Sequence, residues 1–282
     1  MRDWRGTKKM MNKRKYFFLA PYVLWITFFV VLPIILITYQ SFTDIAGKLT
    51  LSNYVTFFTN GTFLKMTLSS FWYAFLITLF ALLISYPAAY ILSTLKRAQL
   101  WLLLIILPTW INLLLKAYAF IGILGRDGMV NSFLGFFGVA PQGMLFTSFA
   151  FLFVATYIEI PFMILPIYNS VIELDPALLR ASQDLGASKF QTFKKVVLPL
   201  TLPGIQAGVQ AVFIPSLSLF MLTRLIGGNK VITLGTAIEE YFLTTMNWGM
   251  GSTIGVILIA IMIITMVFTT DRKKRNRRVN FK

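Results

Sequence analysis

The most unusual reactive side chain in this sequence is a carboxylate in the middle of an apolar run. Glu159 stands between two isoleucines and two residues before Pro161, whose ring leaves backbone groups of a helix without hydrogen bonds. A charge at the centre of a membrane-spanning helix costs about 2.5–3.5 kcal/mol on insertion scales, so it is usually functional or paired. We therefore expect either a carboxylate that meets a cation or an internal ion pair with Lys116 or Arg224.

Other acidic and aromatic residues have the chemistry to act on the same cation. Carboxylates outside the apolar runs attract a cation through their field, and the faces of tryptophan and tyrosine rings hold it at short range. Aromatic residues also anchor membrane proteins at the lipid–water interface, which is the alternative for the rings. The candidate substrate-path residues are Glu159, Trp110, Tyr157, Asp127, Glu239 and Glu240.

The composition excludes several kinds of catalytic site. The 282 residues include no cysteine and no histidine, which removes disulfides, Cys/His metal sites and Ser-His-Asp or Cys-His nucleophiles. The segment 227–230 reads Gly-Gly-Asn-Lys and lacks the spacing of a phosphate-binding P-loop. We expect no catalytic residue, no metal and no cofactor bound by this chain, and an intramembrane enzyme is disfavoured.

The elements that must position these residues are membrane-spanning helices. Hydrophobic residues make up 57% of the chain and charged residues 13%, against roughly 25% charged in soluble domains. A spanning helix needs about 20 mainly apolar residues. Six such runs predict an all-α membrane protein whose spans lie at Tyr16–Thr38, Met66–Leu95, Leu100–Leu124, Leu145–Ile167, Pro203–Leu222 and Met250–Thr270. The six-helix domain, residues 16–270, lies between a basic N-terminus, 1–15, and a basic tail, 271–282.

The distribution of positive charge predicts the orientation. With the N-terminus inside the cell, inner segments hold 20 Lys and Arg residues and outer segments hold four. Seven of the 20 lie in residues 1–15, two at 96–97, four in 168–202 and seven in 272–282. This bias places both termini in the cytoplasm. Because the net charge of +16 is concentrated beside apolar segments, we expect contact with anionic membrane lipids and not with nucleic acid.

The cytoplasmic loop 173–203 contains more residues that start and end helices than a simple linker needs. Asp175 before a proline predicts a helix start, and Gly186 suits the left-handed position that ends the helix. Ser188 and Gln191 have capping-box spacing for a second helix over 189–197, which prolines 199 and 203 are expected to stop. Two short helices held at the membrane surface predict docking into another protein, or else a helix resting on lipid headgroups.

The residues of this loop resemble a family signature. Arg180-Ala181-Ser182-Gln183-Asp184-Leu185-Gly186-Ala187-Ser188, followed by Phe193, Pro199 and Pro203, resembles the EAA loop of ABC importer permeases. In that family the loop forms the helices that couple the permease to its ATPase. The resemblance implies that nine residues of this chain couple it to the ATPase: Arg180, Ala181, Ser182, Asp184, Gly186, Ala187, Ser188, Phe193 and Pro199. Arg180 stands where the family has glutamate, and Asp184 is the candidate to take over its pairing.

The resemblance implies a type I, MetI-like permease fold and a division of labour. The chain would lie in a bacterial plasma membrane and alternate between inward- and outward-open states. Its partners would be a second homologous permease, a cytoplasmic ABC ATPase dimer that uses ATP and Mg, and an extracellular substrate-binding protein. Segments 51–54, 108–112, 161–163 and 166–168 are similar to polyamine-importing members, which implies spermidine and putrescine as substrates.

Two kinds of alternative remain open. Within the family, thiamine, ferric iron or an oxyanion is a possible substrate. Outside it, a secondary transporter driven by an ion gradient usually has more spans or an inverted repeat, and neither is evident in the sequence.

Overall fold

The protein is described from a computed structural model, which covers residues 19–228 and 230–270. The predicted basic segments 1–15 and 271–282, and the start of the first span, lie outside the described residues. After a helical stretch over 19–26, the helical elements are η1 (Thr27–Val31), α2 (Leu32–Ser41), α3 (Ser52–Thr59), α4 (Gly61–Thr94), α5 (Ala98–Ile106), η2 (Leu107–Trp110), α6 (Leu113–Leu124), α7 (Met129–Gly135), α8 (Ser148–Ile172), α9 (Pro176–Asp184), α10 (Lys189–Thr192), η3 (Phe193–Val197), α11 (Leu198–Ser216), α12 (Phe220–Leu225), α13 (Leu234–Glu239), η4 (Glu240–Thr244) and α14 (Trp248–Thr270).

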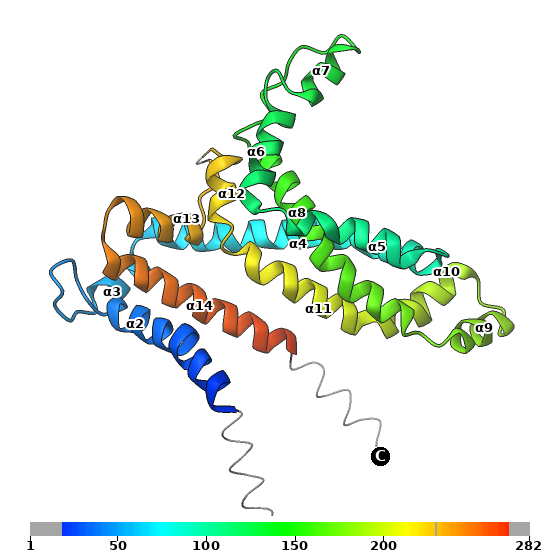
Figure 1. Cartoon of the computed structure of the whole chain (residues 1–282), viewed down its shortest axis with the longest axis horizontal. Helices are drawn as coiled ribbons and strands as arrows, with labels where there is room; N and C mark the ends of the chain where they lie inside the picture. The colour runs from blue at the N-terminus through cyan, green and yellow to red at the C-terminus, as the bar shows by residue number, and fades with distance from the viewer. Residues whose placement is uncertain (1–18, 229, 271–282) are drawn as a thin grey trace, which may run out of the picture.

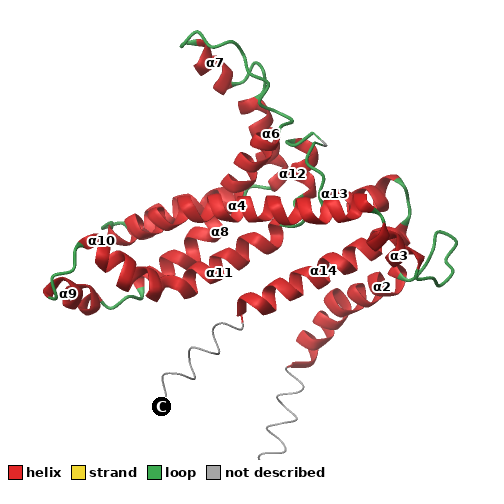
Figure 2. Cartoon of the chain, turned by 180° about the vertical axis from the view of Figure 1, so that it is seen from behind, coloured by secondary structure: helices red, strands yellow, loops and turns green. Residues whose placement is uncertain are grey.

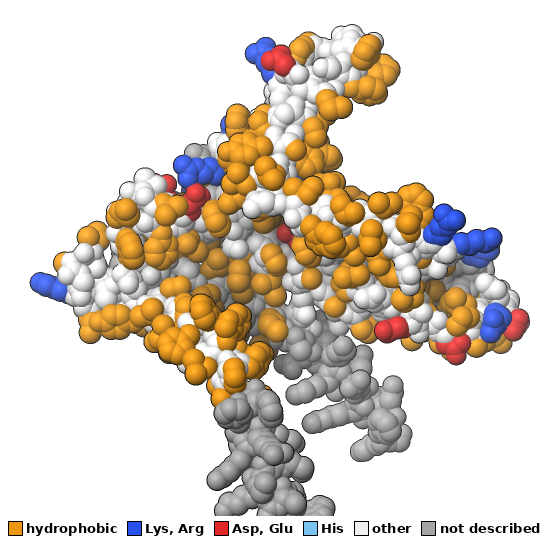
Figure 3. Space-filling model, viewed as in Figure 1, with side chains coloured by type: hydrophobic (Ala, Val, Ile, Leu, Met, Phe, Trp, Pro, Cys, Tyr) orange, Lys and Arg blue, Asp and Glu red, His pale blue; other side chains and the backbone are white. Residues whose placement is uncertain are grey.

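The all-helical architecture and the number of spans agree with the sequence. Five helices are long and apolar enough to cross a membrane, and a bent pair makes a sixth when its two pieces are counted as one span. The five are Leu19–Ser41, Gly61–Thr94, Ser148–Ile172, Lys189–Ser216 and Trp248–Val267. Apolar side chains cover most of the face in view, whereas Lys and Arg lie toward its extremities (Figure 3). This distribution suits a chain whose solvent is lipid.

The third predicted span is broken, so the expectation of one helix over 100–124 is wrong. The pieces Ala98–Trp110 and Leu113–Gly135 meet at 96°. Ile111 between them is extended, with ψ 133°, and the side chain of Asn112 accepts a hydrogen bond from the Leu114 N–H at 2.8 Å. A new helix therefore starts at Asn112 in a different direction. α6, α7 and the loop up to α8, residues 113–147, form an arm that projects from the bundle (Figure 1).

The fifth span begins earlier than predicted, because prolines 199 and 203 do not stop the preceding helix. Lys189–Ser216 is one continuous helix. The N–H of Leu198 bonds to the carbonyl of Phe193, five residues earlier, in a wider turn directly before Pro199. Such a turn relieves the clash between a proline ring and the preceding turn. The span ends at Ser216 and not at residue 222, and α12 follows as a separate short helix.

The centre of the bundle is a layer of α4, α8 and α11, which lie side by side (Figures 1 and 2). Gly204 and Gly208 of α11 allow the close approach to α8 that their spacing indicates. A Cβ on Gly204 would lie 2.4 Å from the Ser170 Cβ, and one on Gly208 would lie 2.7 Å from the Met163 Sδ. Gly251 and Gly255 of α14 have the same spacing, but a Cβ on Gly255 would meet open space.

A second cluster joins α14 to α3, α13 and the start of α4. Its fully buried members include Phe57, Leu217 and Ile254. α14 also packs along α2. The first span is otherwise open, because none of its apolar window is buried within this chain.

Candidate functional site

The two-helix segment, residues 173–203, has the helix caps and the glycine turn that its sequence predicts, although its second helix continues into the fifth span. The Asp175 carboxylate accepts a hydrogen bond from the Ala177 N–H at 2.8 Å, and Gly186 has a φ of +79°. The Ser188 hydroxyl accepts from the Gln191 N–H at 3.2 Å, and the Gln191 side chain accepts from the Ser188 N–H at 2.9 Å. These two bonds complete a capping box at the start of α10. The segment is therefore ordered by its own residues.

A hydrogen bond between hydroxyls joins the two helices of this segment. Ser182 Oγ of α9 lies 2.6 Å from Thr192 Oγ1 of α10. Thr192 is buried, so losing its partner would leave a hydroxyl with a desolvation cost of about 1–3 kcal/mol. The bond fixes α9 to the helix that continues into the fifth span.

Aromatic contacts and a further hydrogen bond connect that helix to the bundle. The Phe193 ring packs edge-on against Tyr86 and Tyr90 of α4, with centroid distances of 5.6 and 5.8 Å. The Tyr86 hydroxyl lies 2.8 Å from Thr201 Oγ1 of α11, and both residues are buried. Side-chain contacts thus connect α9 with two spans of the central layer. The sequence gives no signal of these contacts, because Tyr86 and Thr201 are far apart along the chain.

The tip of the segment presents an uncovered surface. Leu185 is 88% exposed and Phe190 is 71% exposed. Arg180 and Asp184 are also exposed, and within the described residues neither belongs to an ion pair. Of the other predicted coupling residues, Ala181, Gly186, Ser188 and Pro199 are exposed, whereas Ser182, Ala187 and Phe193 are half-buried. Exposed apolar side chains beside free charges are typical of a surface that binds another protein.

A cavity of about 280 Å³ lies at the break of the third span. We call it the break cavity. Its lining residues are Ile105, Pro108, Thr109, Lys116, Tyr157, Ile158, Ile160 and Pro161. Lys116 and the predicted Tyr157 thus meet at one site, and the Tyr157 ring packs edge-on against Phe120 at 5.1 Å. Trp110 lies in η2 at the same break and is 83% exposed within this chain.

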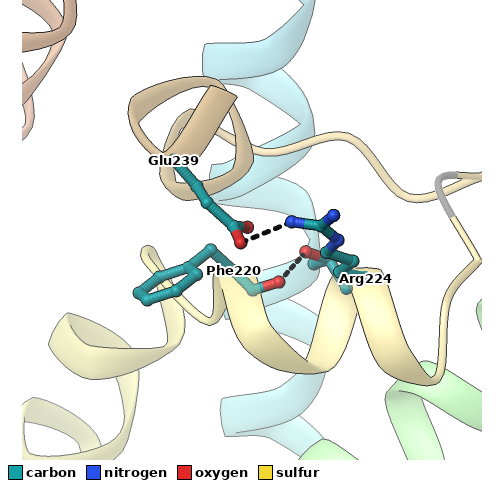
Figure 4. A network of polar contacts seen from close by, with 4 residues as sticks. Phe220, Arg224 and Glu239 are labelled. Carbon is teal, nitrogen blue, oxygen red and sulfur yellow. Dashed lines mark hydrogen bonds and ion pairs between the residues drawn. The ribbon is translucent and has the colours of Figure 1, made fainter. Parts of the chain in front are cut away.

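Glu159 lies in the turn of α8 that lines the break cavity and is 5% exposed. Lys116 of α6, one of the two cations predicted to pair with it, lines this cavity. Within residues 19–228 and 230–270, however, Glu159 forms no ion pair. The alternative pairing with Arg224 is wrong, because the Arg224 guanidinium donates to Glu239 at 2.8 Å and ties α12 to α13 (Figure 4).

The remaining acidic candidates lie elsewhere in the molecule. Asp127 is exposed on the arm between α6 and α7. Glu239 and Glu240 lie at the junction of α13 and η4, and Glu240 lines a second cavity of about 370 Å³. We call this the α13 cavity. The six predicted path residues therefore occupy three separate places and do not form one site.

Comparison with known proteins identifies the family. No family model matches the chain. It is 36% identical over 283 residues to the spermidine/putrescine transport system permease protein PotB of Haemophilus influenzae, covering 96% of this chain and 99% of that one. It is 35% identical to PotB of Escherichia coli K12 over 266 residues, 90% of this chain and 96% of the relative. The chain belongs to the PotB family of ABC importer permeases.

Solved structures agree with this family in fold. The chain superposes with a TM-score of 0.81, at 18% identity and 98% coverage of both chains, on a bacterial alginate ABC transporter in complex with an alginate-bound periplasmic protein. It superposes with a TM-score of 0.58 and 19% identity on the inward-facing MetNI methionine ABC transporter, covering 76% of this chain and 94% of that one. The fold is that of a type I ABC importer permease, as the EAA-like residues indicated.

Proposed function

We propose that the chain is the membrane permease subunit of a bacterial importer for spermidine and putrescine, driven by a partner ATPase. The observation that carries the proposal is the identity to PotB over almost the whole length of both chains. In this proposal the subunit alternates between inward- and outward-open states in the plasma membrane. A second homologous permease, an ABC ATPase dimer that uses ATP and Mg, and an extracellular binding protein complete the transporter. Both termini are in the cytoplasm.

The two-helix segment is the proposed docking element for the ATPase. Its exposed tip supplies the contact, and the bonds from Ser182 through Phe193 to Tyr86 supply a path into the bundle. Arg180 and Asp184 are the charged groups that would pair across this contact. Because Arg180 reverses the usual charge of the family position, its ATPase partner is expected to be acidic.

The proposed substrate path passes the break cavity. Glu159 is the carboxylate that would neutralise an ammonium of the polyamine inside the membrane, where an unpaired charge is costly. Trp110 and Tyr157 at the same break supply ring faces for the cation. Asp127 and Glu240 would act earlier, at the outer side, by attracting the polycation, whereas Glu239 is already paired with Arg224.

The test of the substrate is uptake of radiolabelled spermidine by proteoliposomes that hold the assembled transporter. We expect uptake that requires ATP, Mg and the binding protein, and that unlabelled putrescine inhibits. Thiamine, ferric iron or an oxyanion transported in preference to spermidine would overturn the polyamine assignment. Uptake that continues without ATP but follows an ion gradient would overturn the whole proposal.

The role of Glu159 has its own test in the same assay. Replacing it with glutamine removes a charge-assisted interaction worth about 1.5–3 kcal/mol, which corresponds to a loss of about 10- to 100-fold in uptake. The control is Asp44→Asn, which removes a carboxylate from a surface turn where it accepts from the Lys48 N–H. Wild-type uptake by Glu159→Gln would remove Glu159 from the path.

A further inference from the structure

The α13 cavity has the size of a small-molecule site. Its volume of about 370 Å³ falls within the 300–1,000 Å³ range of ligand pockets. It lies between the start of α4, the residues before α13, and η4, at the opposite end of the bundle from α9 and α10 (Figure 1). Its lining residues are Asn60, Thr62, Phe63, Met66, Val231, Ile232, Thr236, Ala237, Glu240, Tyr241 and Thr245.

The charge on the cavity wall is an uncompensated carboxylate. Glu239 and Glu240 are adjacent, but their surroundings differ. Arg224 neutralises Glu239 through an ion pair of 2.8 Å, whereas Glu240 has neither an ion pair nor a side-chain hydrogen bond within the described residues. No arginine or lysine belongs to the lining of the cavity. The α13 cavity therefore favours a cation.

Aromatic rings on the wall add a second feature that binds cations. The rings of Phe63 and Tyr241 have centroids 6.0 Å apart and are inclined at 38°. Phe63 is 4% exposed and stacks on Phe57 at 5.4 Å, which holds its ring in place. A cation near such ring faces gains electrostatic attraction in addition to that of a carboxylate.

The rest of the lining restricts the kind of cation. Met66, Val231 and Ile232 form an apolar part of the wall, which suits methylene groups, and Asn60, Thr62, Thr236 and Thr245 add neutral oxygen acceptors. Protein sites for Ca²⁺ usually combine several carboxylates, whereas this lining has one, and an alkylammonium places its chain on apolar side chains and its three N–H donors on acceptors. One carboxylate, neutral acceptors, ring faces and an apolar stretch of wall match the alkylammonium.

We propose that the α13 cavity binds one aminoalkyl end of a polyamine at the outer face of the bundle, with Glu240 as the counter-ion and Phe63 and Tyr241 as the ring contacts. This inference rests on the proposed polyamine import. It adds an entry site separate from the break cavity, and gives distinct roles to Glu239, which pairs within the chain, and to Glu240, which faces the ligand.

The absence of cysteine from the chain allows a direct test. Thr245→Cys places a single thiol on the cavity wall, in an assembled transporter whose other subunits carry no reactive cysteine. Its labelling rate is measured with a cationic trimethylammonium-ethyl and an anionic sulfonato-ethyl methanethiosulfonate. Adding Glu240→Gln is expected to lower the cationic-to-anionic rate ratio about three- to tenfold, because one nearby charge affects the two reagents in opposite directions. The matched control, Glu173→Gln, removes one charge at the far end of the bundle and should leave the ratio unchanged.

Protection by the ligand gives the second readout. Spermidine is expected to slow labelling of Thr245→Cys saturably, and 1,4-butanediol, which has the same carbon chain as putrescine without charge, is not. An equal ratio with and without Glu240→Gln, or equal protection of both variants by spermidine, would overturn the site. Spermidine uptake by the same preparation separates the two proposals. Uptake without protection refutes the site alone, whereas protection without uptake supports the site and refutes the import function.

Discussion

Phe193 is the residue through which the two-helix segment is held against the bundle, and replacing it with alanine gives a quantitative prediction. Its two edge-on ring pairs, with Tyr86 and Tyr90, are together worth about 1–3 kcal/mol beyond area burial. Loss of a half-buried aromatic side chain adds about 1 kcal/mol. The total of about 2–4 kcal/mol corresponds to about a 30- to 1000-fold increase in the equilibrium constant for detachment of the segment.

Hydrogen–deuterium exchange measures this detachment in the purified chain. Backbone amides of α9 and residues 185–192 should exchange faster by that factor in Phe193→Ala, whereas amides in the middle of α8 should be unchanged. Phe190→Ala is the matched control, because Phe190 lies three residues earlier and is 71% exposed. If Phe193→Ala and Phe190→Ala showed the same exchange, the ring contacts would not hold the segment.

Three further predictions concern the bonds and close contacts of the bundle. Tyr86→Phe should lower the free energy of unfolding by only about 1 kcal/mol, because Thr201 keeps its bond to the Val197 carbonyl when the Tyr86 hydroxyl is removed. In a Thr201→Ala background the same change should have no such effect, because the bond is already lost; thermal melts of the four proteins test this. Gly204→Ala should destabilise by about 1–3 kcal/mol through overpacking against α8, and Gly255→Ala should not; equal melting temperatures would contradict the close α8–α11 contact. Removing Arg224 and Glu239 singly and together should give a coupling energy below about 1 kcal/mol, because the Arg224 side chain is 61% exposed; a larger value would contradict a solvent-screened pair.

Local signals in the sequence predicted local structure well. The spans followed from apolar runs because backbone groups in lipid must bond within the helix. The caps at Asp175 and Ser188 and the turn at Gly186 were predictable because each depends on residues no more than three positions away. These same positions carried the resemblance to the ABC importer permeases.

The effect of each proline on its helix could not be predicted from the neighbouring sequence. Pro161 and Pro166 lie inside the continuous helix α8, and Pro199 follows a wider turn that lets its helix continue. Pro108, in an equally apolar run, precedes a 96° bend. A proline in a span is tolerated where neighbouring groups bond to the backbone groups that it leaves without hydrogen bonds, and it disrupts the helix where they do not. The sequence alone does not reveal those neighbours.

The candidate site depended on contacts between distant segments, which pattern alone could not place. Glu159 was singled out as a charge inside an apolar run, and it is buried, but the residues that surround it and those that surround Glu240 became apparent only in three dimensions. The pairing of Arg224 with Glu239, and not with Glu159, followed from the placement of α12 beside α13. Charge and residue type thus predicted the participants, and the packing of helices determined which of them meet.

The central claim is that the two-helix segment contacts the ATPase, and site-directed cross-linking tests it most directly. The chain has no cysteine, so Leu185→Cys at the tip carries a thiol-reactive photocross-linker at one position of this subunit. Phe136→Cys, equally exposed at 88% but on the arm, is the control. In the assembled transporter, the account predicts that Leu185→Cys cross-links to the ATPase with a yield that changes when ATP is added, and that Phe136→Cys does not. A cross-link to the ATPase from residue 136 and none from residue 185 would contradict it.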